Sequence, residues 1–345
     1  MPPTQPDQGQ YMRFGLFGGV KTERSGGLED SQGYDGFIEY VVEADRLGFR
    51  QLFMVEHHFT GHGQVSASMT VLAYLAAKTR HIRLGTAVVV LPWHNPVLVA
   101  EQVATLDLLS GGRVDFGVGK GYRQSEFDGF CIPMAEATER FDESLEVIRK
   151  AWTASRNENG GRFSHHGKRW HFDNIVVEPA PLQRPHPPLW MAAGSRDSIR
   201  RAAREGCNLL LDQLAQVDQI GERIALFREE CAQVGRAYDP LMVATARPLQ
   251  MIHHESERAL AYETRRRVLG VIGDLARDKL PQRVEDDTAA LLGMPGEVVA
   301  RLRELERVGA TNILLIDPHA SLGNLRAFAR EIMPAFVPSG AAVAE

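Results

Sequence analysis

The chain has 345 residues, of which 44% are hydrophobic and 24% charged, so it can bury a full core and is not intrinsically disordered. Its formal net charge is −5 and it contains no long basic run, which argues against a nucleic-acid partner. The three cysteines are far apart and form no Cys-x-x-Cys pair, which argues against a disulfide framework or a zinc site.

The sequence also carries no sign of a membrane or secretory segment. No stretch reaches about 18 uninterrupted apolar residues, the length that spans a bilayer. Residues 1–11 are rich in Pro and Gln and lack the apolar segment of a signal peptide. We therefore expect a soluble cytoplasmic protein without a membrane partner, and a disordered arm at residues 1–11.

Apolar segments suited to buried strands alternate with segments of helical periodicity along the rest of the chain. The expected strands lie at residues 12–17, at the start of 51–59, and at 82–91, 114–118, 189–193, 208–211, 242–252 and 313–316. The expected helices lie at residues 34–47, 66–78, 96–109, 136–152, 196–204, 217–234, 296–308 and 322–332. Asn95 and Pro96 are typical of a helix N-terminus, with Asn as the cap and Pro in the first turn.

Eight strands, each followed by a helix, are the pattern of a parallel (β/α)8 barrel, the TIM barrel. A doubly wound open sheet is the alternative, but it usually has a glycine-rich phosphate loop after its first strand, and Phe17-Gly18-Gly19-Val20 does not match one. We expect a single barrel domain at 12–335 and a frayed tail at 336–345. Two insertions are expected, one with a hairpin after strand four (about 156–188) and a mostly helical one after strand seven (255–294).

The most informative stretch is 51–59, in which an apolar strand leads directly into Glu56, His57 and His58. In a barrel of this kind the active site lies at the carboxyl ends of the strands. A carboxylate and two imidazoles are costly to bury there and useful for proton transfer. Adjacent side chains on a strand point in opposite directions, so the two rings are not expected to share a metal ion. We expect one ring to act as a general acid or base and the other to brace the loop.

Two glycine-containing segments at other strand ends are candidates for binding an anion. Gly119-Lys120-Gly121-Tyr122-Arg123 matches neither a P-loop nor a GxGxxG motif, so its glycines indicate close backbone approach to a flat or anionic group, with Lys and Arg as cations. A solvated turn is the alternative. At Gly194-Ser195-Arg196-Asp197-Ser198 a strand leads into a helix whose free N–H groups and dipole favour phosphate. Its alternative is plain N-capping by Ser195, and phosphate sites in this fold more often follow strands seven and eight.

Weaker candidates lie in the loops next to these strand ends. His62 and His94 are close in sequence to the expected site, and Trp93 either roofs a pocket or packs in the core. The histidines of the two insertions are expected to be exposed.

Four segments together resemble the bacterial luciferase-like flavin monooxygenases. They are Met12-Arg13-Phe14-Gly15, then Glu56-His57-His58-Phe59-Thr60, then Leu84-Gly85-Thr86-Ala87-Val88-Val89-Val90-Leu91-Pro92, and Leu106-Asp107-Leu108-Leu109-Ser110-Gly111-Gly112-Arg113. The resemblance covers the chain from residue 12 to about 335. It implies a (β/α)8 barrel that takes reduced FMN (FMNH2) from a separate flavin reductase and reacts it with O2. A flavin C4a-hydroperoxide then oxygenates a small organic substrate, such as an aldehyde, a ketone or a ring compound. The resemblance also implies a homodimer.

The same resemblance assigns roles to individual residues. His57 matches the family's catalytic histidine, and Glu56 and His58 match its neighbours. Lys120 stands where many members have a phosphate-binding Arg, and Gly194 stands where the luciferase itself has Glu; both departures suit loose binding of a diffusible cofactor. Ala87 and Val88 match the pair under the isoalloxazine ring, and Ser195 and Ser198 match phosphate-contacting hydroxyls. The cofactor-binding residues expected on this basis are Ala87, Val88, Lys120, Tyr122, Arg123, Gly194, Ser195 and Ser198.

On this hypothesis, His57 and the turn at 194–198 contact the same bound flavin, and the insertion at 255–294 forms a mobile lid. Two other functions are compatible with the fold. One is an oxidoreductase that transfers hydride with the deazaflavin F420 and needs no O2. The other is a non-catalytic partner subunit of a luciferase-like pair, against which the intact Glu-His-His run argues.

Overall fold

The computed structural model describes residues 11–20, 22, 28–61, 65–154, 160–276 and 283–336. Residues 1–10 of the expected arm, residues 337–345 of the expected tail and His62 lie outside these described residues. Among the described residues, no helix is both long and apolar enough to cross a membrane. The chain divides into two compact units. We call residues 17–45 and 51–192 the central unit, and residues 1–16, 46–50 and 193–345 the C-terminal unit.

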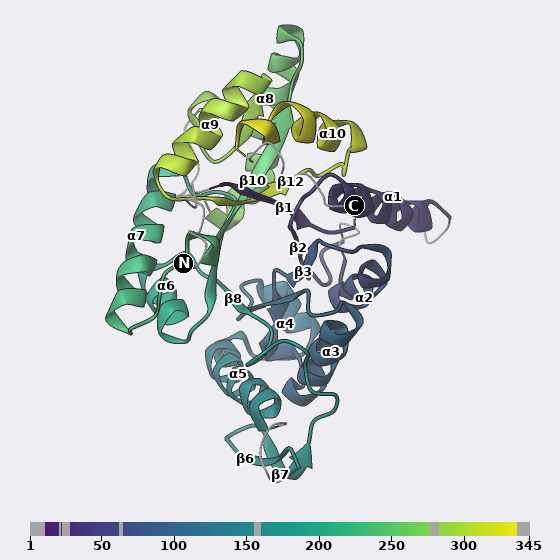
Figure 1. The fold of residues 1–345 in the computed structure, drawn as a ribbon, viewed down its shortest axis with the longest axis vertical. Helices are drawn as coiled ribbons and strands as arrows, with labels where there is room; N and C mark the ends of the chain where they lie inside the picture. The colour runs from purple at the N-terminus through teal and green to yellow at the C-terminus, as the bar shows by residue number, and fades with distance from the viewer. Residues whose placement is uncertain are drawn as a thin grey trace, which may run out of the picture. The chain divides into compact units, whose positions relative to one another are not determined.

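Four parallel strands in the order β2-β3-β5-β8 form the sheet of the central unit, with the short strand β4 also paired to β5. Figure 1 labels β2, β3 and β8 of this sheet. The strands of this unit are β2 (Gln51–Met54), β3 (Arg83–Thr86), β4 (Val89–Val90), β5 (Val114–Gly119), β6 (Arg162–His166), β7 (His171–Val176) and β8 (Leu189–Ala192). Its helices are α1 (Leu28–Arg46), α2 (Ser68–Lys78), α3 (Pro96–Leu109), α4 (Gln124–Gly129) and α5 (Ala137–Ala154). Every residue of β2 and β5 is buried, which fits strands covered on both faces.

Helix α3 begins where the sequence predicts. The side-chain oxygen of Asn95 accepts hydrogen bonds from the N–H groups of Val97, at 2.9 Å, and Leu98, at 3.4 Å. Pro96 occupies the first turn, where its missing N–H costs no hydrogen bond. The predicted cap is therefore confirmed.

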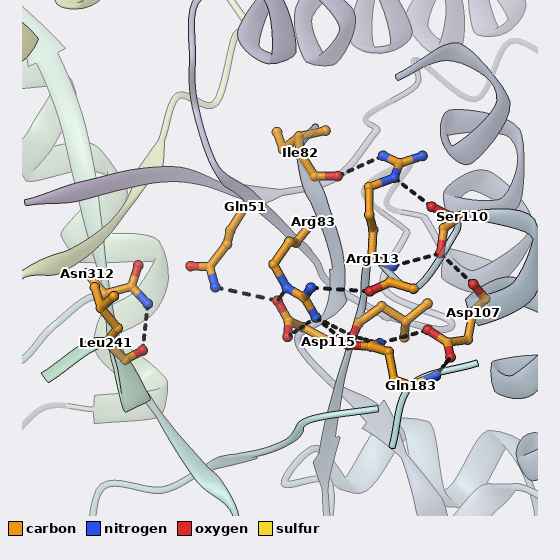
Figure 2. Close-up of polar contacts among 12 residues, drawn as sticks. Gln51, Ile82, Arg83, Asp107, Ser110, Arg113, Asp115, Gln183, Leu241 and Asn312 are labelled. Carbon is orange, nitrogen blue, oxygen red and sulfur yellow. Dashed lines mark hydrogen bonds and ion pairs between the residues drawn. The ribbon is translucent and has the colours of Figure 1, made fainter. Parts of the chain in front are cut away.

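A network of charged and polar side chains joins the amino ends of β3 and β5, and Figure 2 shows it. Arg83 opens β3, and its Nε and Nη2 atoms each lie 2.9 Å from one oxygen of Asp115 in β5, which makes a bidentate ion pair. The side chain of Gln183 donates to Asp107 at 2.7 Å and to a backbone carbonyl of β5 at 2.8 Å. Arg113 donates to the backbone carbonyls of Ser110 and Ile82. We call Arg83, Asp107, Arg113, Asp115 and Gln183 the amino-end network.

The insertion before β8 contains the predicted hairpin, in which β6 and β7 pair antiparallel. One carboxylate of α5 fastens its turn: Glu143 accepts hydrogen bonds from the backbone N–H groups of Arg169, at 3.1 Å, and Trp170, at 2.8 Å. The ring of His165 lies 3.3 Å from the same carboxylate. His165 is only 5% exposed, so the expectation that the insertion histidines are exposed is wrong for this one, because its ring is packed between the hairpin and α5.

The C-terminal unit is built around β10 (Val243–Met251), which pairs in parallel with three strands. These are β9 (Asn208–Leu211), β11 (Leu291–Gly293) and β12 (Asn312–Ile316), and β12 also pairs with β1 (Arg13–Gly18). The helices are α6 (Arg196–Arg204), α7 (Val217–Gln233), α8 (Arg258–Ala276), α9 (Pro295–Arg307) and α10 (Leu322–Glu331). The insertion expected to be mostly helical contains α8, and its role as a lid stays a prediction.

Along the chain, β1, β2, β3, β5, β8, β9, β10 and β12 alternate with helices and pair in parallel, which is the predicted (β/α)8 TIM-barrel fold. The open-sheet alternative is wrong. Two details differ from the sequence prediction. The strand expected at 82–91 is broken into β3 and β4 at Ala87–Val88, whose peptide bond is cis, and the short helix α4 was not expected.

Candidate active site

Glu56 lies just beyond the carboxyl end of β2 and is 5% exposed. Its Oε1 atom lies 2.9 Å from Nε2 of His94 and 3.2 Å from Nε2 of His58. Burial raises the pKa of Glu56, but the hydrogen bonds with His58 and His94 lower it, and the net pKa lies below the ordinary value. An ionised carboxylate only accepts hydrogen bonds, so both rings donate through Nε2–H. Glu56 therefore fixes the orientation of His58, and the expectation that one ring braces the loop stays a prediction.

His57 faces a different carboxylate. Its Nδ1 atom lies 3.2 Å from Oε1 of Glu126, and that oxygen also accepts the backbone N–H of His58 at 2.9 Å. Glu126 belongs to α4 and is 2% exposed; burial raises its pKa, while His57, the N–H of His58 and the charge of Arg123 lower it, with a net lowering. Since Nδ1 donates to this carboxylate, a neutral His57 ring has an unprotonated Nε2, the atom that can accept a proton.

An aromatic layer packs around His58. The ring stands edge-on to Phe130 at 4.8 Å and to Trp93 at 5.5 Å, measured between ring centroids. Phe130 in turn stacks on Trp93 at 5.2 Å and meets Phe59 at 5.0 Å. Trp93 also contacts Phe127 of α4, so it belongs to this layer beside the histidines. The layer covers part of the His58 ring with apolar surface, and Phe59 of this layer is itself 61% exposed.

The break between β3 and β4 lies next to these residues. The N–H of Ala87 donates to the carbonyl of Met54, the last residue of β2, at 2.6 Å. Thr86 closes the gap in the ladder, because its hydroxyl donates to the Gly117 carbonyl at 2.8 Å and accepts from the Gly117 N–H at 2.9 Å. Ala87 and Val88 are half-buried, whereas the residues on either side of them are buried. The break therefore presents a small apolar surface at the carboxyl ends of the strands.

The glycines at the end of β5 and just after it allow the backbone to pass close to this break. A Cβ atom at Gly119 would lie 2.5 Å from Cγ2 of Val88, and Gly121 has φ of +77°, which a larger residue rarely adopts. Lys120 is exposed and donates to the Thr138 hydroxyl at 3.3 Å. The Arg123 guanidinium lies 5.5 Å from the centroid of the exposed Tyr122 ring, and its Nε is buried without an acceptor among the described residues. The segment thus places two cations beside the site.

Gly194, Ser195 and Ser198 belong to the C-terminal unit. Ser195 caps α6: its hydroxyl accepts from the Ser198 N–H at 3.3 Å, and the Ser198 hydroxyl accepts from the Ser195 N–H at 3.1 Å. The N-capping alternative is therefore present in the structure, and phosphate binding stays a prediction. Near Gly194, Arg223 forms an ion pair of 3.0 Å with Asp212, which follows β9.

The central unit brings Glu56, His57 and His58 together with two residues that sequence reasoning missed or ranked low, Glu126 and His94. Nothing in the local sequence marks Glu126, because its partner His57 is 69 positions away. His94 could have been ranked higher, since Asn95 and Pro96 fix it at the start of α3. Within the described ranges, no group of three or more His, Cys, Asp or Glu side chains could hold a metal ion.

Comparisons with known proteins agree on one family. The sequence profile described as "Luciferase-like monooxygenase" matches residues 12–312. The oxygenase component of a flavin-dependent trigonelline monooxygenase from Acinetobacter baylyi is 28% identical, over 95% of this chain and 96% of the relative. An FMNH2-dependent dimethylsulfone monooxygenase from Pseudomonas putida is 26% identical, over 84% of this chain and 85% of the relative.

A solved structure resembles the whole fold. The monooxygenase RslO1 from Streptomyces bottropensis superposes with a TM-score of 0.80 at 27% identity, over 94% of this chain and 100% of that one. The profile match at residues 12–312 includes every residue of the candidate site in the central unit.

Proposed function

Because this chain belongs to the luciferase-like monooxygenase family, we propose that it is the oxygenase component of a two-component system. It would take FMNH2 from a separate flavin reductase and use O2 to oxygenate a small organic substrate: an aldehyde, a ketone or a ring compound. Two relatives named as an oxygenase component and as an FMNH2-dependent enzyme support this choice. The observation that carries it is the His57–Glu126 pair, 3.2 Å apart at the carboxyl end of β2.

The residues of the central unit suit a flavin. Ala87 and Val88 offer a half-buried apolar surface for an aromatic ring, and Lys120 and Arg123 offer positive charge for a phosphate. The buried Nε of Arg123 has no acceptor among the described residues, so an added anion would satisfy it. A bound reduced flavin would supply the electrons that activate O2.

The protein's own contribution is proton control and exclusion of water. Nε2 of His57 accepts or returns a proton during the reaction, while Glu126 holds Nδ1–H and stabilises the ring when it is protonated. Glu56 keeps His58 and His94 in place. The aromatic layer of Phe59, Trp93 and Phe130 limits the access of water to these side chains, which suppresses side reactions with water.

Oxygen consumption tests the proposal directly. The purified protein is supplied with FMNH2 by a reductase and mixed with a panel of aldehydes, ketones and ring compounds under isotopically labelled O2. We expect one substrate class to gain a labelled oxygen atom. Conversion without O2 by reduced F420 would support the hydride-transfer alternative instead, and failure to bind any flavin would support the partner-subunit alternative.

The phosphate prediction has its own test. If the Ser195 end of α6 binds the phosphate of FMN, Ser195→Ala will weaken FMN binding about tenfold and leave riboflavin, which lacks the phosphate, unchanged. Ser321→Ala is the matched variant, because Ser321 caps α10 after β12 in the same manner. If only Ser321→Ala weakens FMN binding, the phosphate site follows the last strand, and the assignment to Ser195 is wrong.

A further inference from the structure

Arg247 is a buried cation whose hydrogen-bonding capacity is only partly used. It lies within β10 and is fully buried, at 0% exposure. Its Nη1 atom donates to the carbonyl of Ala215 at 2.6 Å and to the carbonyl of Ala289 at 3.2 Å. Its Nε and Nη2 atoms have no hydrogen-bond acceptor in the described part of the chain. Unsatisfied charged donors are rare in protein interiors because each forfeits its hydration without compensation.

Two neighbours share this property. Thr245 stands two residues before Arg247, hence on the same face of β10, and its fully buried hydroxyl also has no partner among the described residues. Arg265 of α8 is 3% exposed; its Nε donates to Asp287 at 2.8 Å, but its Nη2 has no acceptor within the described ranges. We call Thr245, Arg247 and Arg265 the buried donor cluster. Four donor groups on these three residues have no acceptor in the described part of the unit, which points to an acceptor supplied by a ligand.

The charges around Arg247 favour an anion. Arg223 is paired with Asp212 and Arg265 with Asp287, whereas the hydrogen bonds of Arg247 go to backbone carbonyls. Burial lowers the pKa of Arg247 to about 10; the two aspartates act against this, and the two other arginines add to it. Arg247 therefore remains charged at neutral pH, with three arginines set against two carboxylates.

The geometry of the free donors selects the kind of anion. Nε–H and one N–H of Nη2 lie along the same edge of a guanidinium and point in parallel, which is the arrangement that binds both oxygens of a carboxylate. The hydroxyl of Thr245 adds a further donor on that face of the strand. A point-like cation such as Lys would not supply this fork.

We propose that Nε and Nη2 of Arg247 form a subsite for a carboxylate, and that the substrate of this enzyme carries one. Assigning the carboxylate to the substrate rests on the proposed function; the existence of the subsite does not. Because the guanidinium is fully buried, entry of the ligand requires local opening of the chain beside the Nε–Nη2 edge, while the carbonyls of Ala215 and Ala289 hold Nη1.

Thermal unfolding with small probes tests the subsite without flavin. Benzoate supplies a carboxylate on a ring, benzamide is its neutral counterpart, and inorganic phosphate is a different oxyanion. We expect about 10 mM benzoate to raise the Tm of the wild-type chain by about 2–4 °C, with no rise from benzamide at the same concentration. Phosphate is expected to have a smaller effect. No rise with benzoate, or an equal rise with benzamide, would overturn the inference.

Three variants locate the effect. Arg247→Met removes the fork with little change in volume and should abolish the benzoate shift. Arg247→Lys keeps the charge and should weaken benzoate binding about tenfold, which covers the case in which the Met variant does not fold. Arg266→Met removes an exposed arginine of the same helix as Arg265 and should leave the shift intact. A full benzoate shift in a folded Arg247 variant would place the anion elsewhere and end the proposal.

An activity comparison then separates this inference from the proposed function. Among ring compounds in the FMNH2 assay, carboxylates should exceed their amides in kcat/KM by at least about tenfold, and Arg247→Met should remove that preference. Benzoate binding without any oxygenation would leave the subsite standing and overturn the proposed function. Oxygenation with equal kcat/KM for carboxylates and amides would support the proposed function and overturn the carboxylate subsite.

Discussion

The two ends of the sheet in the central unit hold buried carboxylates in contrasting ways. At the amino ends of β3 and β5, Asp115 is paired with both nitrogen donors of Arg83. At the carboxyl end of β2, Glu56 and Glu126 are paired with histidine rings. Arginine keeps its charge at every physiological pH, whereas histidine gains and loses a proton near neutrality.

This difference assigns a structural role to the amino end of the sheet and a catalytic role to its carboxyl end. The amino-end network fixes the strands through arginines that stay charged at every physiological pH, so it is suited to holding the fold together. The carboxyl-end pairs use groups that exchange protons, so they are suited to catalysis, and in barrels of this kind that end carries the active site. Substitutions at the two ends should therefore fail in different ways.

The largest effect is expected at the carboxyl end, and it should be on activity alone. His57→Ala should lower kcat about 10²–10⁴-fold, the contribution typical of a general acid or base. Binding of reduced flavin and the Tm should change little, since the ring is partly exposed. Rapid-mixing kinetics with FMNH2 measure turnover and flavin binding, and a thermal scan measures the Tm. Unchanged turnover would show that His57 takes no part in the reaction, and the carboxyl end of the sheet would then have no assigned catalytic group.

At the amino end the loss should be in stability. Asp115→Asn removes the charge that neutralises Arg83; breaking a fully buried pair costs about 3–5 kcal/mol, and this half-buried pair should lie at the low end, at about 3 kcal/mol. Urea unfolding measures the difference, with kcat of the folded enzyme unchanged. Glu306→Gln is the control, because it breaks an exposed pair with Arg303 and should cost about 1 kcal/mol or less. Equal losses for both variants would contradict the role given to the amino-end network.

A smaller effect is expected for the carboxylate behind the histidine. Glu126→Gln keeps a hydrogen-bond acceptor for Nδ1–H of His57 but removes the charge, so kcat should fall about tenfold while the KM for flavin stays the same. Glu126→Asp, which restores the charge, should recover part of the loss. Asp128→Asn changes an exposed carboxylate of the same helix and should have no effect. Equal kcat values for all three variants would mean that Glu126 does not act through His57.

The smallest effect concerns acid stability. The pKa values of Glu56 and Glu126 are lowered from 4.5 in the folded chain, so each carboxylate stabilises the fold above that pH, and the stabilisation is lost as pH falls through the folded-state pKa. Glu56→Gln should therefore lower the Tm by about 1–3 °C at pH 7 and by much less near pH 3. Thermal scans across this range measure the change. If the Tm difference between the wild type and Glu56→Gln instead grew toward low pH, the lowered pKa assigned to Glu56 would be wrong.

Much of the fold follows from local pattern. The strand at 208–211 and the helix at 196–204 have the predicted bounds, and most other elements begin and end within a few residues of them. Helix α4 escaped prediction because Gln124–Gly129 is too short to show a helical period. The break at Ala87–Val88 lies inside a continuous apolar run, where residue type gives no sign of it.

The cluster of carboxylates and histidines could be read from the sequence only where its members are neighbours. Glu56, His57 and His58 stand together and could be recognised, whereas Glu126 and Arg247 acquire meaning through partners far along the chain. Arg247 sits in a strand that otherwise follows an apolar pattern, and sequence alone cannot distinguish a buried arginine with open donors from one paired in the interior. That distinction requires the positions of Ala215 and Ala289, which come from two separate loops.

The fastening of the β6–β7 hairpin has an evolutionary consequence. One carboxylate, Glu143, anchors two backbone N–H groups of its turn, and among the described strands β6 and β7 pair only with each other. A segment attached in this way behaves as a cassette: recombination can exchange it for another loop while the barrel strands keep their register. Laboratory grafting can use the same junction, retaining position 143 and replacing the residues between β6 and β7.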